Sequence, residues 1–74
     1  MIWQERVLSG KCYLMLNRYE KRAYARPSLW SSPDDSEEVG YEEAKAFVKD
    51  QRLAKDDYYS SYLLSVYCIP EKCS

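Results

Sequence analysis

Alternation of apolar and polar positions is clearest over residues 11–17, where it predicts a β-strand. One face of that strand carries Cys12, Leu14 and Leu16, and the other carries Tyr13 and Met15. Residues 2–8 are apolar at both ends around a polar centre, and the following Ser9-Gly10 is typical of a turn, so we expect a first strand over 2–8. The polar residues 17–20 predict a chain reversal after the second strand.

Residues 22–26 alternate large polar side chains with alanine until Pro27 removes a backbone donor. This pattern predicts a short third strand at a sheet edge. Residues 28–40 contain Pro33 and four acids after Leu29-Trp30, and they predict a mobile acidic loop.

Residues 41–54 show helical periodicity, with Gly40 as the expected N-cap. Acids occupy the first turn and bases the last, which is the order that the helix dipole favours. The predicted buried stripe is Tyr41, Ala44, Phe47 and Val48, and the predicted exposed face carries Glu43, Lys45, Lys49 and Asp50.

Residues 58–69 are rich in aromatic and β-branched side chains and precede Pro70, which favours a long last strand. Its two apolar faces are typical of a central strand. We therefore predict one α+β domain over residues 1–74. It consists of a small, mostly antiparallel sheet of three to four strands with one helix packed on a face, in ββ(β)αβ order.

One helix covers only one face of such a sheet, so apolar side chains on the second face need a cover. We assign five to that face: Tyr13, Met15, Leu63, Tyr67 and Ile69. Either the 28–40 loop folds back over them with Leu29 and Trp30, or they meet a partner protein or a second copy of the chain.

The composition excludes several kinds of chemistry. The chain has no histidine, and its two glycines, Gly10 and Gly40, lie too far apart for a phosphate-binding loop. Its three cysteines are an odd number at irregular spacing, which favours a reducing compartment, with Cys12 and Cys68 as buried small hydrophobes. We expect no catalytic residues, no cofactor and no metal.

Charge is segregated along the chain although the net charge is −1. Residues 34–44 contain six acids and no base, and such a surface can imitate the phosphates that a basic groove binds. The ordinary alternative is a solvated loop leading into a helix N-terminus. The expected partner-binding residues are Trp30, Asp34, Asp35, Glu37, Glu38 and Tyr41.

Residues 1–33 contain six bases against two acids, and aromatic residues lie between the bases. The aromatic rings can stack on nucleobases and the basic side chains can neutralise phosphates, although the isoelectric point of about 5.4 is low for a nucleic-acid-binding domain. The residues expected in this alternative are Arg18, Arg22, Tyr24 and Arg26.

In size and character, without a shared motif, the chain resembles small single-domain inhibitors encoded by phages and mobile elements, including anti-CRISPR proteins. The sequence thus predicts a non-enzymatic protein-binding module, which could inhibit a nucleic-acid-processing complex. The alternatives are a single-stranded nucleic-acid-binding module and a homodimeric structural subunit. The uncharged apolar runs are too short to span a bilayer, and no signal-peptide pattern begins the chain, so we expect a cytoplasmic protein.

Overall fold

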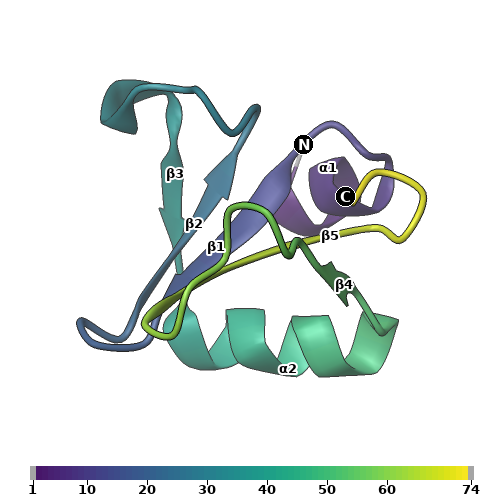
Figure 1. Cartoon of the computed structure of the whole chain (residues 1–74). Helices are drawn as coiled ribbons and strands as arrows, with labels where there is room; N and C mark the ends of the chain where they lie inside the picture. The colour runs from purple at the N-terminus through teal and green to yellow at the C-terminus, as the bar shows by residue number, and fades with distance from the viewer. Residues whose placement is uncertain (1, 74) are drawn as a thin grey trace.

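The computed structural model describes residues 2–73, which form a five-stranded sheet and two helices (Figure 1). In chain order the elements are α1 (Trp3–Leu8), β1 (Tyr13–Asn17), β2 (Arg22–Arg26), the 3-10 turn η1 (Pro33–Asp35), β3 (Glu37–Val39), α2 (Tyr41–Gln51), β4 (Ala54–Lys55) and β5 (Leu64–Cys68). The strand order across the sheet is β3-β2-β1-β5-β4, and every neighbouring pair is antiparallel. The predicted α+β class is confirmed, with five strands in place of three or four and with one additional helix.

The strand and reversal predicted at residues 11–20 are confirmed. Leu14 and Leu16 of β1 are buried, whereas Tyr13 and Met15 are half-buried on the other face. The reversal is held by Asn17, whose side-chain oxygen accepts the backbone N–H of Glu20 at 2.9 Å. An Asn acceptor of this kind stabilises a tight turn locally, before any tertiary contact forms.

Helix α2 begins where predicted, after Gly40, but it ends three residues early, at Gln51. Arg52 adopts a left-handed conformation (φ 53°, ψ 48°), and its N–H bonds to the carbonyls of Lys49 and Val48. This geometry closes the helix. The chain then reverses so that Ala54 pairs with Cys68, which forms the short strand β4.

The first predicted strand is wrong, because residues 3–8 form helix α1. Trp3 and Val7 are four positions apart, so they share one face of a helix, and both are buried. The edge of the Trp3 ring packs on Phe47 of α2, with ring centroids 5.0 Å apart. Gly10, at φ 80°, then turns the chain into β1.

The prediction that residues 22–26 form an edge strand is only partly correct. β2 spans Arg22–Arg26, but it lies inside the sheet because β3 pairs with its outer side. β3 and η1 fall within the segment predicted to be a loop, so this part of 28–40 has regular structure. The mobility of the segment stays a prediction.

The last strand is shorter than predicted, and its faces differ from those expected. β5 covers residues 64–68, whereas residues 58–63 form a loop before it. Tyr67 pairs with Leu14, which places it on the helix side and not on the second face, and Val66 pairs with Met15 instead. β5 does lie between two strands, β1 and β4, as expected for a central strand.

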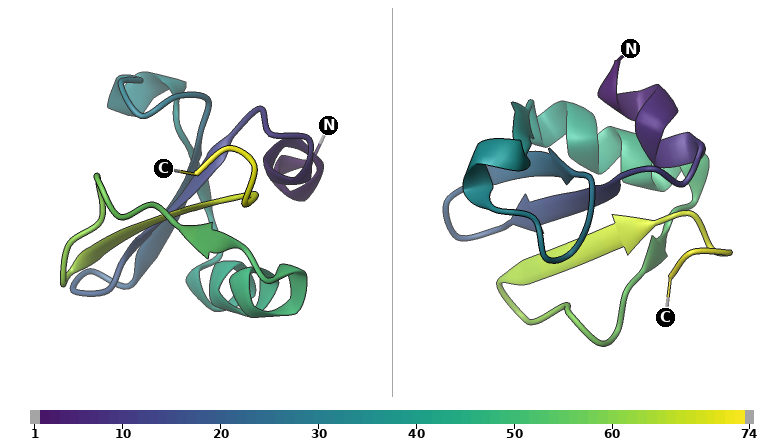
Figure 2. Two further views of the ribbon diagram at one scale, coloured as in Figure 1. Left: turned by 45° about the vertical axis from the view of Figure 1, so that its right-hand side comes forward. Right: turned by 90° about the horizontal axis from the view of Figure 1, so that it is seen from above.

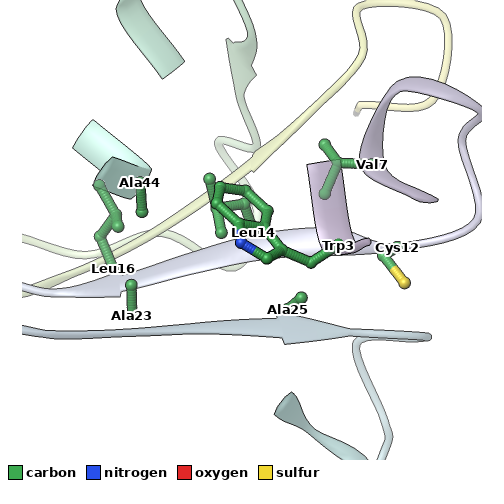
Figure 3. Packing of buried hydrophobic residues seen from close by; sticks show 8 residues of the cluster. All are labelled: Trp3, Val7, Cys12, Leu14, Leu16, Ala23, Ala25 and Ala44. Carbon is green, nitrogen blue, oxygen red and sulfur yellow. The ribbon is translucent and has the colours of Figure 1, made fainter. Parts of the chain in front are cut away.

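Both helices pack on one face of the sheet, and the segment containing η1 lies on the other (Figure 2). The core side chains between helices and sheet are Trp3, Val7, Cys12, Leu14, Leu16, Ala23, Ala25 and Ala44 (Figure 3). Small alanines on β2 and α2 let the helix approach the sheet closely. Within residues 2–73, the helices are too short and too polar to cross a membrane.

Cys68 and Cys73 form a disulfide, whereas Cys12 is buried as a free thiol. Cys68 is buried on β5 as predicted, but it is bonded to Cys73 and is not a free thiol. The end of β5 and a turn of the C-terminal segment bring the two cysteines together, a proximity that their spacing alone did not show.

Reduction of this disulfide should destabilise the fold by about 2 kcal/mol, because the bond closes a short loop of six residues. We would measure urea unfolding with and without a reductant. Since Cys12 is already free, any change reports on the Cys68–Cys73 bond alone. An unchanged unfolding midpoint would contradict this expectation.

Candidate interaction surface

The sheet face opposite the helices carries side chains from β1, β2 and β5. Two loops partly cover it, residues 28–36 after β2 and residues 58–63 before β5. Met15, Tyr24 and Val66 lie on this face, as their mutual register shows. Arg26 lies beside them, and its guanidinium donates to the backbone carbonyl of Ser31, which ties the 28–36 segment to the sheet. The loop thus covers part of the second face, as one of the two sequence-based alternatives predicted.

A hollow of about 270 Å³ lies between this face and the loop, lined by Met15, Tyr24, Arg26 and Ser36. The Met15 sulfur is 3.7 Å from Nη1 of Arg26, a weak contact for a guanidinium donor. Among residues 2–73, no acceptor meets the buried Nε of the same side chain. The hollow therefore offers an apolar floor with a guanidinium in its wall.

Three aromatic rings, Trp30, Tyr58 and Tyr59, meet where the two loops approach each other; we call them the aromatic cluster. The Trp30 and Tyr59 ring centroids are 5.4 Å apart, edge to face, and those of Tyr58 and Tyr59 are 4.8 Å apart. Despite these contacts Trp30 remains 80% exposed and Tyr58 78% exposed. The large exposed Trp30 therefore does not serve as the predicted apolar cover.

Side-chain capped turns hold the aromatic cluster in place. The N–H of Trp30 donates to the Ser28 hydroxyl at 3.2 Å. On the other loop, one carboxylate oxygen of buried Asp56 accepts the N–H groups of Tyr58 and Tyr59, each at 3.0 Å. Partial burial raises the pKa of the Tyr59 phenol, and the neighbouring Tyr58 and Asp56 raise it further.

The acidic residues predicted as a single partner-binding set are divided between two sides of the molecule. Glu37 lies on the helix side, where it pairs with Arg6 of α1. Glu38 alternates to the other face and approaches Nε of Arg22 at 3.7 Å. Asp34 and Asp35 are exposed on η1, in the loop that also carries Trp30.

Tyr41, the last member of that set, lies away from the aromatic cluster. It is half-buried at the start of α2 and packs against the core. Lys45 of the same helix stands over its ring, 4.8 Å from the centroid. Tyr41 therefore has a structural role in seating the helix, as its place in the predicted apolar stripe also indicated.

The basic set is also divided. Arg22, Tyr24 and Arg26 share one face of β2, because they are alternate residues of a strand. A hydrogen bond with Tyr24, and then the charge of Glu38, raise the pKa of Arg22. Arg18 lies elsewhere and donates to the Tyr62 carbonyl and the Tyr67 hydroxyl.

Sequence reasoning found Trp30 but missed its partners Tyr58 and Tyr59, which it assigned to a strand. The usable signal was Asp56 followed by a run of polar and aromatic residues with Ser60 and Ser61, which is typical of a capped turn. The chain matches no protein-family model, and searches of curated proteins and of solved structures found no match.

Proposed function

We propose that this chain is a non-enzymatic protein-binding module whose contact surface is the aromatic cluster together with the acidic turn η1. The observation that supports this most directly is the pair of large, highly exposed rings in the cluster, Trp30 and Tyr58. Exposed tryptophan and tyrosine are the side chains most often found as binding hot spots.

Preorganisation also favours binding at this surface. Ser28 and Asp56 fix the backbone on either side of the cluster, and the edge-to-face contacts orient the rings. A partner would then bury apolar ring surface without first ordering the loops, which lowers the entropic cost of association.

The charge beside the cluster indicates the chemistry of the partner. Asp34 and Asp35 lie in the same loop as Trp30, so a basic surface with an apolar centre would be complementary. Proteins that process nucleic acids present such surfaces, and inhibition of one of them is the specific form of the proposal. The proposal includes a cytoplasmic location. Because the cytoplasm keeps thiols reduced, a Cys68–Cys73 disulfide that persists in cells would count against that location.

Single-stranded nucleic acid binding is the alternative, and three of its four expected residues do share a face. All three arginines in that set already have acidic or carbonyl partners: Arg18 has the Tyr62 carbonyl, Arg22 has Glu38 and Arg26 has the Ser31 carbonyl. A phosphate would have to compete with these contacts, which favours the protein-binding proposal.

Affinity capture from lysate of the source cells, with and without nuclease, distinguishes the two classes. We expect a protein in stoichiometric amount that remains bound after nuclease treatment. Capture that disappears with nuclease would reject the proposal in favour of nucleic acid. If the capture yields only further copies of the chain, and light scattering gives a molar mass twice that of the monomer, the homodimer is favoured.

Reversal of the η1 charges tests the acidic part of the surface. The double variant Asp34→Lys, Asp35→Lys should slow association with the captured partner by about tenfold at low salt and weaken the salt dependence. The matched control, Glu5→Lys with Asp50→Lys, makes the same charge change on the exposed surfaces of the two helices. Equal association rates for the two double variants would show that η1 is not part of the contact.

A further inference from the structure

A buried carboxylate and two cysteine sulfurs meet beside the edge strand β4, where the same carboxylate also caps the turn of Tyr58 and Tyr59. Asp56 follows β4, Cys68 ends β5, and Cys73 belongs to the C-terminal segment. One ligand atom from each of the three lies within 4.8 Å of those of the other two. Asp56 and Cys68 are each 1% exposed.

The backbone holds these three residues together independently of the bond between the sulfurs. The N–H of Asp56 donates to the Val66 carbonyl at 2.8 Å, which extends the β4–β5 ladder. The N–H groups of Lys72 and Cys73 both donate to the Ile69 carbonyl, at 2.9 and 3.2 Å. This turn folds the C-terminal segment back, so Cys73 should stay near Cys68 after the disulfide is reduced.

Two thiolates and a carboxylate are a donor set suited to a thiophilic divalent cation. Zn²⁺ binds sulfur at about 2.3 Å and carboxylate oxygen at about 2.0–2.2 Å in a tetrahedron, so neighbouring ligand atoms lie roughly 3.3–3.8 Å apart. The two sulfurs are bonded to each other in the oxidised chain, so after reduction they would move apart to reach that spacing, whereas the carboxylate oxygen would approach them by no more than about 1 Å. A water molecule would complete the four ligands.

We propose that reduction of the Cys68–Cys73 disulfide creates a site for Zn²⁺ or a similar thiophilic divalent cation, with Asp56 as the third protein ligand. A phosphine supplies the two electrons and becomes the phosphine oxide by taking oxygen from water, whose two protons go to the sulfurs. A cellular dithiol supplies the same electrons and protons and becomes a disulfide. The cation then displaces both thiol protons as it binds the thiolates.

Titration with Co²⁺, whose absorption reports tetrahedral thiolate ligation, tests the proposal. After reduction by a phosphine and its removal under anaerobic conditions, we expect one Co²⁺ per chain, displaced by one equivalent of Zn²⁺. The oxidised chain should give no such spectrum. Absence of the spectrum from the reduced chain, or one Co²⁺ per two chains, would overturn a site within one chain.

Matched variants identify the ligands. Asp56→Asn keeps the turn acceptor and should weaken Co²⁺ binding at least about tenfold, whereas Asp57→Asn, an exposed neighbour, should leave it unchanged. Cys73→Ser should abolish thiolate absorption typical of two sulfurs, and Cys12→Ser should preserve it. Because Cys73 is half-buried and lies outside the helices and strands, this variant keeps the test valid if Asp56→Asn does not fold. Wild-type binding by either Asp56→Asn or Cys73→Ser would reject the assignment.

Discussion

Replacing Trp30 with alanine should weaken binding to the protein partner at least about 30-fold, which corresponds to the roughly 2 kcal/mol that defines a binding hot spot. The ring is 80% exposed in the isolated chain, so its removal costs the fold little packing. In a complex the same ring would become buried beside Tyr59. Equilibrium titration of the captured partner with each variant measures the effect.

Tyr19→Ala is the control for Trp30→Ala. Tyr19 is 72% exposed in the turn before β2, whereas Trp30 lies in the loop after β2. The two variants thus remove similarly exposed aromatic rings from opposite ends of one strand. Equal losses of affinity would assign binding to general aromatic stickiness and would contradict a specific contact at the cluster.

Leu14→Ala should have the largest effect on stability, a loss of about 2–5 kcal/mol in the free energy of unfolding. Leu14 is fully buried in β1, between β2 and β5, and faces both helices through the core (Figure 3). A domain of this size has roughly 4–11 kcal/mol of stability in total. The substitution should therefore remove a large part of it and populate the unfolded chain.

Urea unfolding followed through the fluorescence of buried Trp3 measures this loss. Leu63→Ala is the matched control, because Leu63 is 49% exposed in the loop before β5. We expect it to cost less than about 1 kcal/mol. Similar losses for the two leucines would contradict the assignment of the core to the helix side of the sheet.

The sequence predicted those elements whose own periodicity was strong. β1 and α2 combine regular spacing with clear end signals, and the antiparallel α+β class follows from them. Helix α1 was predicted as a strand because Ile2 and Leu8 obscured the i, i+4 pair of Trp3 and Val7. Its helical state depends on packing against Phe47, a contact between distant parts of the chain.

Tertiary pairing also explains the other differences. Glu37-Glu38-Val39 has little intrinsic strand preference, and it forms β3 because β2 offers an unpaired side. Residues 58–63 have high strand preference. The Asp56 carboxylate nevertheless accepts the backbone N–H of Tyr58, and the Ser60 hydroxyl accepts the backbone N–H of Val66, so these residues are held in a loop. For the same reason the candidate surface was only half predicted, since Trp30 meets Tyr59 across two loops that are distant in sequence.

Site-specific photo-crosslinking in nuclease-treated lysate tests the proposed contact surface most directly. A benzophenone-bearing phenylalanine analogue would replace Tyr58 in one chain and Tyr19 in another, both at highly exposed positions. We expect a single adduct with a different protein from position 58 and none from position 19. No adduct at position 58, or an adduct of two copies of the chain, would contradict a protein-binding surface at the aromatic cluster.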